Sequence, residues 1–165
     1  MTKRLSLQLL LLTTLLSLNP AFAGEVVVQD FVKGSLKDIK EERKDQPFLL
    51  VFWSKDCGYC FKEMNMLAGL QPKHPELDIV LVSIDSGLED EMVKHFFDQT
   101  GLEADEIWVF SSDSPRLFSY VDQDWRGELP NTVFHNSKHE YQSIVGEIKY
   151  KQIKNWLKYI KNDQS

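Results

Sequence analysis

The sequence predicts an α/β fold in which a mixed central sheet is flanked by helices. Three observations lead to this prediction. Continuous apolar runs have the length of strands, segments with helical spacing alternate with them, and a strand pair closes the series before a last helix. The chain has 165 residues, which suits one domain after a short leader.

The leader, residues 1–23, differs from the rest of the chain. Lys3 and Arg4 give a positive start, a leucine-rich run extends over 5–18, and Ala21-Phe22-Ala23 has small residues where a signal peptidase reads them. We therefore expect a secretory signal peptide that is cleaved after Ala23, with no stable membrane insertion afterwards. The alternative is an uncleaved anchor, although the run is shorter than the ~20 apolar residues of a membrane span.

Strand and helix patterns alternate through the first part of the remaining domain, residues 24–165. Phe48–Trp53 is apolar at every position, which is typical of a central strand buried on both faces of a parallel sheet. After it, apolar residues recur at three and four positions until Pro72 stops the pattern. We expect strands at 26–28, 48–53, 79–84 and 107–110, and helices at 35–46, 61–70, 89–99 and 115–121.

The last part of the domain has a different pattern. Thr132–Phe134 and Tyr141–Val145 are short runs joined by a polar turn, which predicts a β-hairpin. A helix from about Lys149 to Lys161 follows, with apolar residues along one face. An antiparallel pair added to parallel strands makes the predicted sheet mixed.

The charge of the chain limits its partners. The net charge is −6, and removal of the two basic leader residues makes it −8. Such an acidic body argues against nucleic acid and anionic membrane surfaces as partners.

The two cysteines are the residues most informative about chemistry. Cys57 and Cys60 lie where the apolar strand turns into the following helix. A thiolate is the nucleophile of disulfide exchange, and the N–H groups and dipole at the start of a helix stabilise it. Cys57 would attack a partner, and Cys60, about one turn later, would resolve the mixed disulfide. Gly58 leaves the approach open.

Two other roles for the cysteines remain as alternatives. A purely structural disulfide is disfavoured because so short a loop removes little chain entropy. A zinc site would add His135 and His139, but 74 residues separate Cys60 from His135, and both histidines are expected at the surface of the hairpin turn. No metal is therefore expected. No haem motif or dinucleotide loop occurs, so no cofactor is expected and electrons should come from another protein.

The stretch Phe52–Cys60 resembles the strand-turn-helix active site of the thioredoxin superfamily. The best match within it is the exported TlpA/ResA-like group of thiol–disulfide oxidoreductases, and the resemblance covers about 48–165. The strand and helix over 107–121 resemble the αβ insertion of that group, placed before its cis-proline loop. The resemblance implies a thioredoxin-like fold.

The resemblance also implies roles for individual residues. Glu63, in the Cys-x-x-Glu pattern, would tune thiol protonation as a catalytic carboxyl. Leu129 and Pro130 resemble the cis-proline loop, whose backbone edge can pair with a substrate strand. Tyr59, between the cysteines, would contact a partner, and Trp53 would shield the site, with simple core packing as its alternative.

Several positions depart from the pattern of the group. Asp56 and Tyr59 replace its common Trp and Pro, Asn65 replaces a common helix Pro, and Val51 stands where thioredoxin keeps a buried Asp. The Cys-Gly-Tyr-Cys sequence is instead similar to exported disulfide isomerases of the DsbC type.

These features lead to a functional expectation. We expect a periplasmic disulfide reductase that acts on protein thiol and disulfide substrates and is kept reduced by a membrane thiol–disulfide electron donor. The alternatives are a disulfide oxidase or isomerase, and a non-enzymatic assembly or binding factor.

Overall fold

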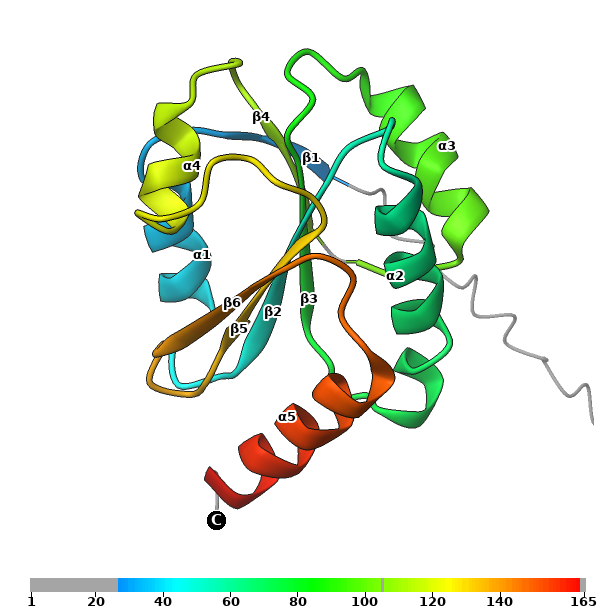
Figure 1. Ribbon diagram of the computed structural model, residues 1–165, viewed down its shortest axis with the longest axis vertical. Coiled ribbons are helices and arrows are strands. Elements are labelled where there is room, and N and C mark those ends of the chain that lie inside the picture. The colour runs from blue at the N-terminus through cyan, green and yellow to red at the C-terminus, as the bar shows by residue number, and fades with distance from the viewer. Residues whose placement is uncertain (1–26, 105, 164–165) are drawn as a thin grey trace, which may run out of the picture.

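The computed structural model describes residues 27–104 and 106–163 and shows a mixed sheet between two layers of helices (Figure 1). The predicted leader and its cleavage site lie outside the described residues. In chain order the elements are β1 (Val27–Phe31), α1 (Ser35–Glu42), β2 (Phe48–Trp53), α2 (Gly58–Ala68), the 3-10 helix η1 (Gln71–Lys73), β3 (Ile79–Ser83), α3 (Asp90–Thr100), β4 (Glu106–Phe110), α4 (Arg116–Val121), β5 (Asn131–His135), β6 (Tyr141–Val145) and α5 (Tyr150–Asp163).

The six strands form a sheet in the order β1-β4-β3-β2-β5-β6. The first four strands in this order, β1, β4, β3 and β2, are parallel to one another, whereas β5 is antiparallel to β2 and β6 is antiparallel to β5. The mixed sheet and the closing hairpin predicted from the sequence are thus confirmed. β2 lies inside the sheet, which explains why all six of its residues are buried.

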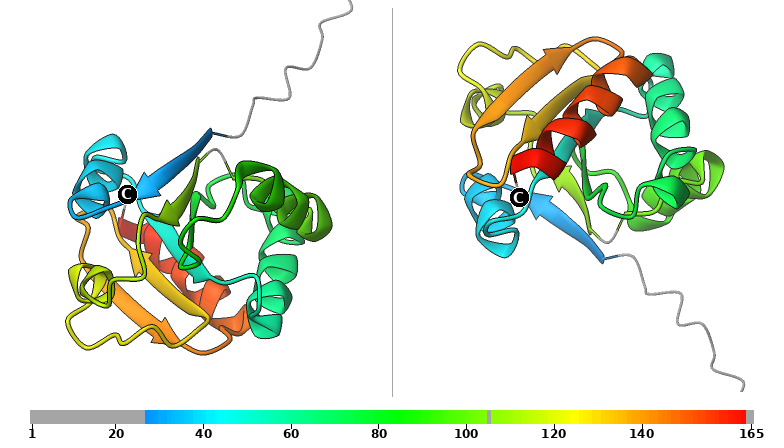
Figure 2. Two further views of the ribbon diagram at one scale, coloured as in Figure 1. Left: turned by 90° about the horizontal axis from the view of Figure 1, so that it is seen from above. Right: turned by 90° about the horizontal axis from the view of Figure 1, so that it is seen from below.

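Side chains of β2 alternate between the two faces of the sheet, as the period of a strand requires. Leu49, Val51 and Trp53 pack with α2, α3 and α5, whereas Phe48 and Phe52 pack with α1 and α4. Figure 2 shows these two helix layers on opposite sides of the sheet. Each face therefore has its own apolar core, and the fully apolar run of β2 serves both.

The αβ insertion contributes strand β4 to the parallel half of the sheet. Its strand β4 pairs with β1 and β3, and Leu117 and Val121 of α4 pack in the core shared with α1. The helices in the described part of the chain are all too short or too polar to cross a bilayer.

Candidate active site

The turn between β2 and α2 places Cys57 at the amino end of a helix. Cys57 is the N-cap of α2, and its backbone is extended (φ −99°, ψ 90°). Its N–H donates to the Ser54 carbonyl at 3.0 Å, and its Sγ accepts from the Cys60 N–H at 3.1 Å. The sulfur therefore occupies the position where unpaired N–H groups and the helix dipole stabilise negative charge.

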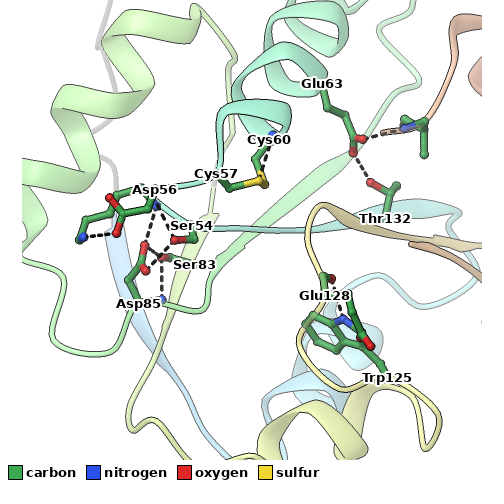
Figure 3. Close-up of a disulfide and its surroundings, with 12 residues drawn as sticks. Ser54, Asp56, Cys57, Cys60, Glu63, Ser83, Asp85, Trp125, Glu128 and Thr132 are labelled. Atoms are coloured by element: carbon green, nitrogen blue, oxygen red, sulfur yellow. Dashed lines mark hydrogen bonds and ion pairs between the residues drawn. A yellow bond between two sulfur atoms is a disulfide. The ribbon is translucent and has the colours of Figure 1, made fainter. Parts of the chain in front are cut away.

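Cys57 and Cys60 form a disulfide, with 5.3 Å between their Cα atoms (Figure 3). Cys57 is half-buried, whereas Cys60 is only 1% exposed. A partner in solution can reach Cys57 but not Cys60. This asymmetry suits an attacking thiol that is followed by a resolving thiol.

Glu63 lies one turn after Cys60 and is buried, with 1% of its surface exposed. The Thr132 hydroxyl donates to its Oε1, and the Ile148 N–H donates to its Oε2 at 2.9 Å. Burial raises the pKa of Glu63, and the two hydrogen bonds offset part of that rise. The carboxyl is thus not a solvated helix residue, and it joins α2 to β5 and to the segment before α5.

The loop before β5 lies at the same edge of the sheet as the cysteines. The register pairs Phe52 with Asn131, so Leu129 and Pro130 stand level with the turn after β2. The Leu129–Pro130 peptide is cis, as the sequence pattern predicted. Nearby, the Trp125 indole donates to the Glu128 carbonyl at 2.9 Å and holds the loop that leads to Pro130 (Figure 3).

The two aromatic residues proposed as contacts have different environments. Tyr59 is 61% exposed, and the Lys62 ammonium lies 4.8 Å from its ring centroid, so a partner can touch it. Trp53 is fully buried and makes edge-on contacts with Phe61, Phe96 and Phe97. Trp53 can therefore influence a substrate only through its neighbours, which is the core-packing alternative.

One carboxylate beside the Cys57 turn was not expected from the sequence. Asp85 follows β3 and accepts from the Ser54 hydroxyl at 2.8 Å and from the Lys55 N–H at 2.6 Å. Its place just after a buried strand was a usable signal, because parallel strands that are neighbours end at the same edge of the sheet. Thr132 and Ile148 carried no such signal, since only the tertiary fold brings them to Glu63.

The histidines of the hairpin turn are far from the cysteines along the sheet. His135 pairs with Phe48, at the opposite end of β2 from the Cys57 turn, so the cysteines and histidines do not form a four-ligand site. The expectation that His135 is exposed is wrong. His135 is 1% exposed, and its ring stacks on that of Phe48 with 4.4 Å between the ring centroids. Strand β5 is buried along its whole length, and His135 is its last residue.

Comparisons with known proteins agree with this geometry. No family model matches the chain. Relatives from Bacillus thuringiensis (strain Al Hakam) and Bacillus anthracis, both named thiol-disulfide oxidoreductase ResA, are 28% identical over 135 residues, which is 79% of this chain and 75% of theirs. A solved thioredoxin-related protein from Neisseria meningitidis serogroup B is 25% identical with a TM-score of 0.59, and covers 74% of this chain and 90% of its own. StoA from Bacillus subtilis is 23% identical with a TM-score of 0.52, and the match covers 68% of this chain and 83% of StoA.

The fold, the Cys57–Cys60 disulfide and these relatives define the chain as a thioredoxin-like thiol–disulfide oxidoreductase. Within this class it is a homologue of ResA. The fold and the class of enzyme predicted from the sequence are thereby confirmed.

Proposed function

We propose that the protein is an exported disulfide reductase that acts on disulfides of protein partners in the periplasm. The Cys57 thiolate attacks a partner disulfide, which breaks the partner's S–S bond, forms a mixed disulfide and releases one partner thiol. Cys60 then attacks Cys57 Sγ, which releases the second thiol and forms the Cys57–Cys60 disulfide. Two electrons pass to the partner, and a membrane thiol–disulfide donor restores them to the cysteines.

The observation that carries the proposal is the buried carboxyl of Glu63 beside the resolving cysteine. Cys60 must lose a proton before it attacks, and water reaches it poorly because it is 1% exposed. Glu63 lies one turn away, and burial raises its pKa, so we assign it as the group that accepts the Cys60 proton and returns it. Leu129 and Pro130 would present the backbone edge for the partner, and Tyr59 would contact it.

A weak electrostatic effect beside Cys57 supports reduction as the proposed direction. Asp56 is adjacent to Cys57 and 80% of its side chain is exposed, and its Oδ2 lies 2.6 Å from Lys55 Nζ in an ion pair that offsets part of its charge. A carboxylate there disfavours the thiolate, which makes the reduced pair less stable and a better reductant. Strong oxidants of this fold have the opposite property, a reduced form stabilised as thiolate.

The test is the reduction potential of the Cys57–Cys60 pair, equilibrated with glutathione or dithiothreitol buffers. A value near or below about −250 mV supports the reductase, whereas one between about −120 and −180 mV would show an oxidase or isomerase. The isomerase is the second candidate because of Gly58-Tyr59 between the cysteines. Full biological function after replacement of both cysteines by Ser would instead indicate an assembly factor.

Export is tested separately. The leader sequence supports it, and the amino terminus of the protein recovered from its native host should then be Gly24. An amino terminus that still contains Lys3 and Arg4 would indicate a retained anchor.

A further inference from the structure

A side chain from the neighbouring strand holds the turn before Cys57. The register pairs Trp53 with Ser83, so β2 and β3 end side by side. Asp85 comes two residues after the end of β3, and Figure 3 shows it gathered with Ser54 and Ser83 beside the disulfide. Neither the cysteine pair nor Glu63 takes part in this cluster.

Asp85 uses both carboxylate oxygens in the cluster. The Ser54 hydroxyl donates to Oδ1 at 2.8 Å, and the Lys55 N–H donates to Oδ2 at 2.6 Å. Ser83 completes the set: its hydroxyl donates to Oδ2 at 3.3 Å and accepts from the Asp85 N–H at 3.1 Å. Ser83 is fully buried and Ser54 nearly so, which keeps water from competing for these bonds.

The hydrogen bonds continue to the residue before Cys57. The Ser54 hydroxyl accepts from the Asp56 N–H at 3.2 Å, and the Ser54 carbonyl accepts from the Cys57 N–H at 3.0 Å. Three consecutive N–H groups, those of Lys55, Asp56 and Cys57, are therefore bound. The backbone that delivers Cys57 to the helix has little freedom left.

We propose that Asp85 is a positioning residue, which holds Cys57 Sγ against the amino end of α2 through the Ser54–Asp56 turn. The sulfur accepts from the Cys60 N–H at 3.1 Å, and such a bond stabilises a thiolate only while the two atoms stay aligned. The proposal rests on Cys57 being the attacking thiol, as in the proposed function, and does not depend on the direction of electron flow.

Asp85 acts on Cys57 in two opposite ways, and their sizes decide the outcome. A nearby negative charge disfavours the thiolate, but near solvent this amounts to about half a pKa unit or less. A helix amino end lowers a thiol pKa by about one unit or more. Loss of alignment should therefore outweigh loss of charge when Asp85 is removed.

The test is the pKa of Cys57 in the reduced protein, measured as the pH dependence of its alkylation by iodoacetamide with the modified peptide identified by mass spectrometry. Asp85→Ala and Ser54→Ala should both raise this pKa by about half a unit to one unit, and slow alkylation at pH 7 about threefold or more. Asp85→Asn, which keeps one acceptor oxygen, should restore part of the loss. The charge control is Asp56→Asn, which keeps the backbone hydrogen bonds of the turn, removes the carboxylate paired with Lys55 Nζ, and should lower the pKa.

A fall of the pKa in Asp85→Ala, similar to that in Asp56→Asn, would show that Asp85 acts only as a charge and would overturn the proposal. An unchanged pKa in Ser54→Ala would also overturn it. If Asp85→Ala does not fold, Ser54→Ala decides, because it loses a single hydroxyl. Alkylation of wild-type Cys57 no faster than Cys60 would contradict the proposed function instead.

Discussion

A buried ionisable side chain lies near each end of strand β5, and the surroundings of these two side chains differ. Glu63 lies against Thr132 near the start of β5, and His135 is its last residue; each is 1% exposed. Glu63 receives hydrogen bonds from Thr132 and Ile148, whereas neither ring nitrogen of His135 has a partner within the described residues. Burial raises the pKa of Glu63 and lowers that of His135 to about 3.

This difference separates a group that can exchange protons from one that cannot. Both groups lose water, which disfavours the charged form. The two hydrogen-bond donors around Glu63 replace part of that water and therefore offset part of the rise in its pKa. Glu63 is also one turn from Cys60. The His135 ring contacts the rings of Phe48 and Tyr141 and stays neutral at neutral pH, so its burial serves packing. Burial alone therefore does not identify a functional group, whereas burial with hydrogen-bond donors supports the role that we propose for Glu63.

The largest effect is expected at the Glu63 end. Glu63→Ala leaves the Thr132 hydroxyl and the Ile148 N–H buried without an acceptor, which costs about 3 kcal/mol of unfolding free energy. Urea unfolding at pH 7 measures this loss.

Glu63→Gln is the matched control for that loss. The amide can accept from Ile148 and donate to Thr132, so the fold is kept. Because the folded pKa of Glu63 is raised, the part of its stabilisation that comes from protonation is present at low pH and is lost as pH rises through that pKa, while its hydrogen bonds remain. The Gln variant should therefore equal or exceed the wild type in stability at pH 7. A Gln variant as unstable as the Ala variant would contradict our account of Glu63.

The next effect concerns His135 at low pH. The unfolded chain binds a proton at a pKa of about 6.5, whereas the folded chain resists it down to about 3, so stability falls as pH falls through this window. At pH 4.5 the loss due to His135 is on the order of 2 kcal/mol. His135→Phe should lack this loss, as judged from unfolding curves at pH 7 and pH 4.5. The control is His95→Gln, at an exposed site, which should lose stability on acidification as the wild type does. Equal acid sensitivity of His135→Phe and wild type would exclude His135 as the cause.

The smallest effect is expected from Lys40, whose charge is the second cause, after burial, of the low pKa of His135. Lys40→Met should raise that pKa by a few tenths of a unit, which weakens the acid loss by about half a kcal/mol or less. The same pair of unfolding curves, compared with His135→Phe, measures it. A larger loss of stability at low pH in Lys40→Met than in wild type would contradict our statement that the Lys40 charge lowers the pKa of His135.

Much of the fold could be predicted from periodicity in the sequence. The apolar run of β2 and the helical spacing after it depend on local pattern; β2 covers the expected residues, and α2 begins three residues earlier and ends two earlier than expected. The cysteine pair and the cis Leu129–Pro130 peptide also have local signatures. These features could be found because the residues that define them are close in the chain.

The partners of the site could not be predicted in the same way. Thr132 reaches Glu63 across 69 residues of chain, and Ser54 reaches Asp85 across 31. Such contacts depend on strand order and register, which a pattern of period two does not determine. The burial of His135 was missed for the same reason, since its neighbour Phe48 comes from β2.

The place of β1 in the sheet has a consequence for how the chain is made. β1 is the first of the described strands to be synthesised, yet its partner in the sheet is β4, and it forms an edge. β2 and β3 are parallel neighbours that can pair before β4 exists. A growing chain therefore holds β1 without a hydrogen-bonding partner until β4 has been synthesised, so closure of this edge comes late in biogenesis.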